Sequence, residues 1–116
     1  MDISQIVSAI SSALGMKIYI KPPNAREQPL PFGLLVADKK DEMTKDKAVR
    51  GKRLNCKLAV WIQDGATLKD VLKNLDTLPE NQQIKTLGEV TNLRVFTTEL
   101  DKNFIEVQAI WDILLR

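Results

Sequence analysis

Residues 53–62 read Arg-Leu-Asn-Cys-Lys-Leu-Ala-Val-Trp-Ile, and this stretch decides the fold. Every second side chain in it is apolar, beginning at Leu54 and ending at Ile62. Because successive side chains of a strand point to opposite faces, the alternation predicts a strand with one buried face. The other elements are predicted outward from this strand.

A helix is predicted directly after this strand. Asp64 and Gly65 form the exit turn. Thr67 with Asp70 resembles a capping box at the start of the helix. Apolar residues then recur with helical spacing up to Pro79, at Leu68, Val71, Leu72, Leu75 and Leu78.

A further helix is predicted near the beginning of the chain, over residues 3–14. Its apolar residues fall at steps of three and four, and they are Ile3, Ile6, Val7, Ile10 and Leu14. Gly15 ends this helix at a left-handed C-terminal position. Its other face is rich in serine, which has weak helix propensity, so the helix needs packing against a sheet to persist.

The remaining segments supply shorter or less regular strands. Residues 17–20 are β-prone, and the proline-rich stretch 22–31 is an irregular connection because proline cannot donate ladder hydrogen bonds. Residues 32–37 are an apolar run with the length of a buried strand. Residues 93–100 and 104–115 are separated by turn residues and predict an antiparallel hairpin.

These elements predict an α+β fold, with a single antiparallel or mixed sheet of about four to five strands packed against two helices. One domain over residues 1–116 is expected, because a chain of this length buries an ordinary core without a metal or disulfide. In the last strand, Ile110 and Leu114 make the second face apolar towards its end. A helix over this face is the favoured interpretation, and an apolar edge offered to a partner chain is the alternative.

The residue types argue against catalysis. Histidine is absent, which removes the usual proton shuttle and the commonest zinc ligand. The acids form no distinct pair, and the five glycines are too scattered to cradle phosphate. Cys56 occupies an apolar position of the alternating strand and is interpreted as a core residue. We therefore predict a protein that is not an enzyme and uses no cofactor or metal. Because the apolar runs of the chain are short, we expect neither a membrane span nor a signal peptide.

The most polar part of the chain is residues 38–53. Seven cations against four acids give it a charge of +3, compared with +2 for the whole chain. We predict a mobile loop that docks on other proteins, because side chains of both signs pair with a neighbour's charges. The candidate interface residues are Lys39, Lys40, Lys45, Lys47, Arg50, Lys52, Arg53, Asp41 and Glu42. A solvated loop with no partner is the alternative.

The order of these elements resembles that of the tail terminator proteins of long-tailed bacteriophages and related neck proteins. The similarity spans an opening helix over residues 3–14, the Leu30-Pro31-Phe32 start of a strand, the alternating strand 54–62 with its following helix, and the closing strand 105–115. It lies in the order of elements and not in a diagnostic motif.

The resemblance implies a ring, typically of six subunits, that caps the growing tail tube and ends its polymerisation. It implies three partners: other copies of the chain, the tail tube protein, and a head-completion or neck protein. The expected location is the host cytoplasm during assembly and then the virion tail, with DNA passing through the ring as the expected nucleic-acid contact.

A small nucleic-acid-binding module is the strongest alternative, because a basic loop near Trp61 offers phosphate contacts and a stacking base partner. Three features oppose it: the net charge is only +2, acids are interleaved with the cations, and the six aromatic residues show no stacking pattern. An adaptor in another cellular assembly would use the same kind of surface, and the sequence does not separate these functions.

Overall fold

Five strands form one mixed sheet in the computed structural model, which describes residues 3–21, 31–43, 49–101 and 104–115. The strand order is β1-β2-β3-β5-β4. The strands are β1 (Lys17–Tyr19), β2 (Phe32–Met43), β3 (Val49–Ile62), β4 (Gly88–Asp101) and β5 (Phe104–Leu115). β1 pairs parallel with β2, and all other neighbours are antiparallel. The predicted α+β fold with a single sheet is confirmed.

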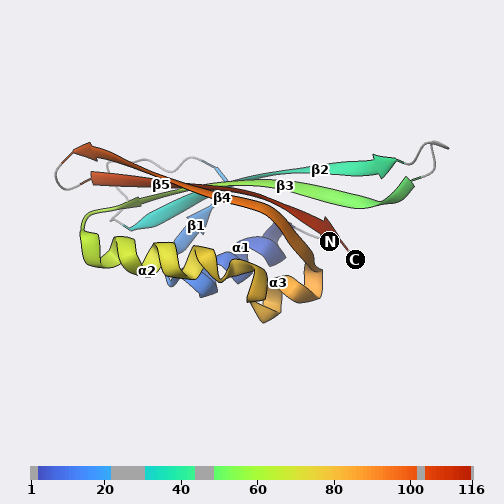
Figure 1. Cartoon of the computed structure of the whole chain (residues 1–116), viewed down its shortest axis with the longest axis horizontal. Helices are drawn as coiled ribbons and strands as arrows, with labels where there is room; N and C mark the ends of the chain where they lie inside the picture. Colours follow the sequence, from blue (N-terminus) through green and yellow to red (C-terminus); the bar gives the residue numbers. More distant parts are fainter. Residues whose placement is uncertain (1–2, 22–30, 44–48, 102–103, 116) are drawn as a thin grey trace.

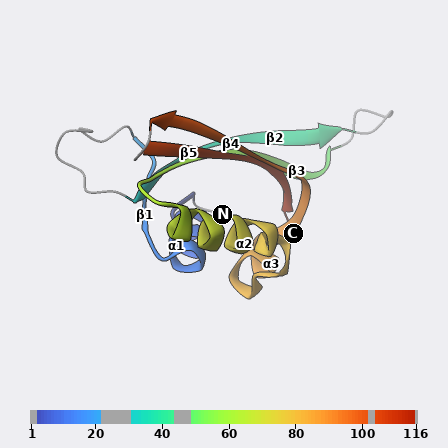
Figure 2. The same ribbon diagram turned by 60° about the vertical axis from the view of Figure 1, so that its left-hand side comes forward.

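The helices lie on one side of this sheet (Figures 1 and 2). They are α1 (Ile3–Leu14), α2 (Gly65–Asp76) and the short α3 (Gln82–Leu87), with a 3₁₀ turn, η1 (Leu78–Glu80), before α3. The sequence predicted two helices, and α3 is an addition to them. Its start is fixed by Asn81, whose side chain accepts a hydrogen bond from the Ile84 amide at 3.1 Å.

A continuous apolar core fills the space between the helices and the sheet. The predicted alternation places the apolar side chains of β3 in this core, where Cys56, Val60 and Ile62 are fully buried. The other fully or almost fully buried side chains are Ile6, Ala9, Ile10, Leu35, Leu58, Val71, Leu75, Leu78, Ile84, Val107, Ala109, Trp111 and Ile113. The apolar faces of the helices and of the strands therefore pack against each other in one core.

The end of α1 and the start of α2 are each fixed by a capping interaction. Gly15 follows α1 with a φ of 66°, the left-handed conformation predicted for it, and its amide donates to the Ser11 carbonyl at 2.8 Å. α2 starts one turn earlier than the predicted capping box at Thr67. Its N-cap is Asp64, whose carboxylate accepts a hydrogen bond from the Thr67 amide at 2.6 Å.

Strands occupy much of the segment that was expected to be a loop. β2 continues to Met43 and β3 begins at Val49, so the prediction of a loop over 38–53 is wrong for residues 38–43 and 49–53. The register pairs Asp41 with Lys52, so these polar segments extend the β2–β3 ladder as a two-stranded ribbon. Residues 44–48 of this segment, like residues 22–30 of the proline-rich connection, lie outside the described residues.

The long β2–β3 hairpin gives the molecule an elongated shape. Its principal extents are 53 × 27 × 22 Å, and the strands run along the long axis (Figure 1). The radius of gyration is 15.1 Å. A compact domain of this length has a radius of gyration of roughly 13 Å. None of the helices described is long and apolar enough to span a membrane.

The apolar end of the last strand is not covered by a helix. The helices pack on the β5 face that carries Val107, Ala109 and Trp111, whereas Ile110 is on the opposite face and 38% exposed. The favoured prediction of a helix over Ile110 and Leu114 is therefore wrong. The core-facing residues of β5 already supply the surface on which the helix layer packs.

Candidate protein-interaction surface

The sheet face opposite the helices is here called the open face. Strand alternation and register assign to it every second residue of the four long strands. Its central residues are Phe32, Leu34 and Val36 of β2, Arg53, Asn55, Lys57, Ala59 and Trp61 of β3, Glu106, Gln108, Ile110 and Asp112 of β5, and Arg94, Phe96 and Thr98 of β4. Both charge signs and several apolar side chains therefore share one surface.

Asp112 is the shared acceptor of a hydrogen-bonded cluster on the open face. Its carboxylate accepts hydrogen bonds from the side-chain amides of Asn55 on β3 and, at 3.2 Å, Asn92 on β4. Arg53 Nη1 lies 3.8 Å from Asp112 Oδ2. Three strands are thus joined through one largely buried carboxylate whose charge is balanced by a guanidinium. This cluster has the features of a structural support and leaves Asp112 little capacity to bind a ligand.

Glu106 is the acceptor of a second hydrogen-bonded cluster on the open face, beside a group of packed aromatic rings. It accepts hydrogen bonds from Trp61 Nε1 at 3.1 Å and from the Gln108 side-chain amide. The Trp61 ring packs on Phe32 with 5.2 Å between centroids, and Phe32 meets Tyr19 edge-on at 5.9 Å. Phe32 is only 6% exposed. Because Trp61 is held by both a hydrogen bond and ring packing, it is poorly placed to stack on a nucleic-acid base.

Between these two groups the open face has a shallow hollow of about 260 Å³. Leu34, Val36 and Ile110 contribute apolar walls, and Lys57 contributes a cation. Val36 is 50% exposed. Shallow, mixed surfaces of this kind suit protein contacts better than small-molecule binding, which favours deep enclosed pockets.

Seven of the nine charged candidates from the sequence lie on β2 or β3. Lys39 and Lys52 are exposed, and Arg53 is half-buried beside Asp112. Lys40, Asp41 and Glu42 belong to the β2 backbone and Arg50 to β3, whereas Lys45 and Lys47 lie outside the described residues. The sequence did not identify Asn55, Asn92 and Asp112 as a group, because their proximity depends on the register of three strands.

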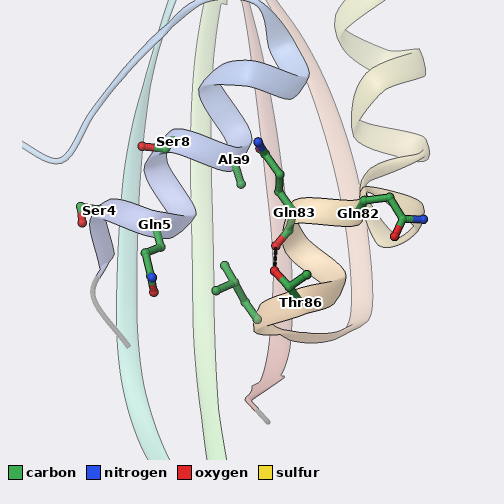
Figure 3. A pocket seen from close by; sticks show the side chains of 8 residues that line it. Ser4, Gln5, Ser8, Ala9, Gln82, Gln83 and Thr86 are labelled. Carbon is green, nitrogen blue, oxygen red and sulfur yellow. Dashed lines mark hydrogen bonds between the residues drawn. The ribbon is translucent and has the colours of Figure 1, made fainter.

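A groove of about 500 Å³ lies on the other side of the molecule, between α1 and α3 (Figure 3). Serine and glutamine side chains dominate its walls, and the Thr86 hydroxyl is bonded to the Gln83 carbonyl at 2.6 Å. The lining residues are Ser4, Gln5, Ser8, Ala9, Gln82, Gln83, Thr86 and Leu87. Among the described residues that line the groove, the side chains include hydrogen-bonding groups, and none is charged or strongly nucleophilic.

The buried thiol of Cys56 is unreactive in this environment. Desolvation by burial, with a smaller contribution from the nearby Asp112 charge, raises the pKa of Cys56 to about 12. The thiolate, which is the nucleophile and metal ligand, is therefore almost absent at neutral pH. Within the described part of the chain, no three acidic, cysteine or histidine side chains are grouped so that they could hold a metal ion.

Two surfaces of the protein are therefore candidates for macromolecular contact: the open face and the charged hairpin that extends it. They combine exposed apolar groups with charges of both signs, the composition of a non-obligate protein interface.

Comparison of the sequence with models of known protein families gives no match, and no curated protein matches it significantly.

Proposed function

We propose that this protein is a structural component of a phage or prophage tail. It assembles into a ring, caps the tail tube, ends its polymerisation and joins it to the head or neck through protein contacts. The order of elements that resembles tail terminators motivates this assignment, and the described α+β fold is compatible with it.

The observation that carries the proposal is the extension of the β2–β3 hairpin beyond the rest of the sheet. β5 ends its pairing with β3 at Leu115 opposite Lys52. Further out, Glu42 and Met43 pair with Gly51 and Val49, and no third strand of the described residues lies beside them, so the hairpin projects as a two-stranded arm (Figure 1). Two-stranded ribbons are marginally stable in isolation, so the arm gains most from a protein surface that covers it.

Charge supports a protein partner for this arm. Residues 38–53 have a charge of +3 and include four acids among seven cations. Electrostatic complementarity of this mixed kind guides orientation and partner choice. A closed ring requires contacts between unlike patches on neighbouring subunits, and an arm at one end of the sheet supplies one of two unlike patches.

The proposal is tested by assembly. The purified protein is examined by native mass spectrometry and negative-stain electron microscopy, alone and with the tail tube protein encoded nearest to it. Rings of one defined size that cap short tubes are expected. Protein that remains monomeric in both preparations would contradict the proposal, and salt-sensitive binding of single-stranded DNA without rings would favour the nucleic-acid module.

Charge reversal tests the part played by the arm. Lys39→Glu with Lys52→Glu is expected to reduce ring formation, because both side chains are exposed on the hairpin. Arg53 is left unchanged because it lies 3.8 Å from Asp112. The matched control is Lys69→Glu with Lys73→Glu, an equal change of charge on the exposed surface of α2. Equal assembly by the two variants would show that the arm is not an interface.

A further inference from the structure

The outer edge of β2 is only partly covered by another strand. β1 pairs with Phe32, Gly33 and Leu34, and no other described strand lies on that side. From Leu35 to Glu42, β2 keeps a regular register with β3 while its outer edge has no strand partner among the described residues. Such an edge presents main-chain donors and acceptors to another chain.

β4 forms the opposite edge of the sheet. It pairs with β5 on one side only, and its register is regular from Arg94 to Glu99, between two irregularities. Its sequence contains neither lysine nor proline, residues that commonly prevent pairing at an edge. The run 94–99 is therefore suited to accept another strand.

The directions of the two edges are compatible with each other. β2 is antiparallel to β3, β3 to β5, and β5 to β4, so β2 and β4 run in opposite directions within one subunit. When two copies stand side by side in the same orientation, β4 of one copy lies antiparallel beside β2 of the next. Each copy uses one edge for each neighbour, which is the unlike contact that a closed ring requires.

Exposed apolar side chains accompany both edges. Val36 on β2 is 50% exposed, and Phe96 and Leu100 on β4 are 51% and 50% exposed. Ile20, directly after β1, is 51% exposed. Val36 lies in the 35–42 run and Phe96 in the 94–99 run. Pairing of these two runs would bring both side chains close to a neighbouring copy and partly remove them from water.

The two runs carry little net charge. Residues 94–99 contain one arginine and one glutamate, which cancel, and residues 35–42 contain two lysines against three acids, a net charge of −1. Main-chain hydrogen bonding and apolar contact would therefore hold this contact together, and not a difference in net charge.

We infer that neighbouring copies of this chain join by β-strand pairing, with the 94–99 run of β4 in one copy docked antiparallel beside the 35–42 run of β2 in the next. This inference rests on the proposed ring and specifies its interface. The five-stranded sheets then form one continuous sheet around the ring, with all helix layers on the same side.

Cysteine cross-linking tests the pairing directly. Val36→Cys is combined in turn with Arg94→Cys, Phe96→Cys or Thr98→Cys, which are alternate positions on the open face of the other edge. Facing residues of adjacent strands lie about 4.5–5.5 Å apart, within the range that a disulfide bridges. The native Cys56 is fully buried and does not interfere. Val36→Cys with Lys73→Cys on α2 is the matched control.

At one of the three β4 positions, mild oxidation is expected to give a ladder of covalent oligomers that ends at the ring size and disappears on reduction. Rings seen by electron microscopy without a cross-link at any β4 position would overturn the edge pairing and leave the ring intact. Cross-linked ladders without an upper limit would support the pairing and contradict ring closure. Equal cross-linking by the α2 control, or no assembly and no cross-link, would also overturn the inference.

Discussion

Asn92 on β4 donates its side-chain amide to Asp112 on β5 at 3.2 Å, and it does so from a left-handed backbone conformation with a φ of 58°. The register between β4 and β5 is interrupted between Thr91 and Arg94, so Asn92 occupies an irregularity of the edge strand. Asparagine tolerates this conformation better than most residues. The hydrogen bond therefore lies at the irregularity that precedes the regular run 94–99 of β4, which we propose as an interface.

Substitution of Asn92 separates the two contributions. Asn92→Ala is expected to lower the free energy of unfolding by about 1–2 kcal/mol, because it loses the hydrogen bond and strains the backbone. Asn92→Gly loses the same bond but accepts a positive φ, so a loss below about 1 kcal/mol is expected. Urea unfolding measures both. Equal losses would show that backbone strain plays no part.

Gly88 at the start of β4 lies too close to β5 for a side chain. A Cβ atom at Gly88 would meet the main-chain carbonyl of Leu114 and, at 2.8 Å, the Ile113 side chain. Gly88→Ala is expected to cost roughly 1–3 kcal/mol because the strands must separate to admit the methyl group. Gly65→Ala is the matched control, since no atom lies within 4 Å of a Cβ at that position. Thermal unfolding that is equally shifted by both would contradict this account.

Acid should weaken the start of α2. The hydrogen bond from the Thr67 amide holds the pKa of Asp64 below its ordinary value. A group whose pKa is lowered on folding contributes stability above its unfolded pKa, and that contribution is lost as the pH falls through the folded pKa. We therefore expect Asp64→Asn, which caps without titrating, to show a smaller acid-induced loss of stability than the parent. Helical circular dichroism and thermal unfolding between neutral and strongly acidic pH measure this difference.

Trp111 fills the centre of the core, and its ring nitrogen, Nε1, finds no hydrogen-bond acceptor in the part of the chain that the structure describes. The side chain is 1% exposed. Trp111→Phe removes this unsatisfied donor together with part of the ring, so we expect a smaller loss than the about 3–5 kcal/mol typical of Trp→Ala in a core. Chemical denaturation of Trp111→Phe and Trp111→Ala provides the comparison. A loss from Trp111→Phe as large as from Trp111→Ala would indicate that the indole N–H has a partner.

The elements with strong periodicity were predicted well. The helix expected over 3–14 and the strand expected over 104–115 coincide with α1 and β5, and the alternating strand around Cys56 is the centre of β3. These predictions succeeded because one face of each element is apolar and its spacing is that of a helix or a strand. The predicted strands 32–37 and 93–100 were too short, because the residues by which β2 and β4 extend beyond them lack a continuous apolar face. The short helix α3 was not predicted, because its sequence also lacks such a face.

The candidate surface was predicted only in part. The charged residues 38–53 were identified from composition, but their strand structure was missed because cross-strand hydrogen bonding leaves no periodic signal in a polar ribbon. The contact of Asn55 and Asn92 with Asp112 also escaped sequence reasoning. Residues distant in the chain meet through register, and one sequence does not specify register.

The sequence by itself determined the α+β class, the core-facing residues of β3 and β5, the absence of histidine, and the charge of the 38–53 segment. The tertiary structure alone decided that the helices share one side, that Ile110 lies on the open face, and that β2 and β4 are the edges available for pairing. Local patterns specify which face of an element is apolar, because that depends on residues a few positions apart. The neighbours of that face depend on strand order and register, which arise only when the whole chain packs.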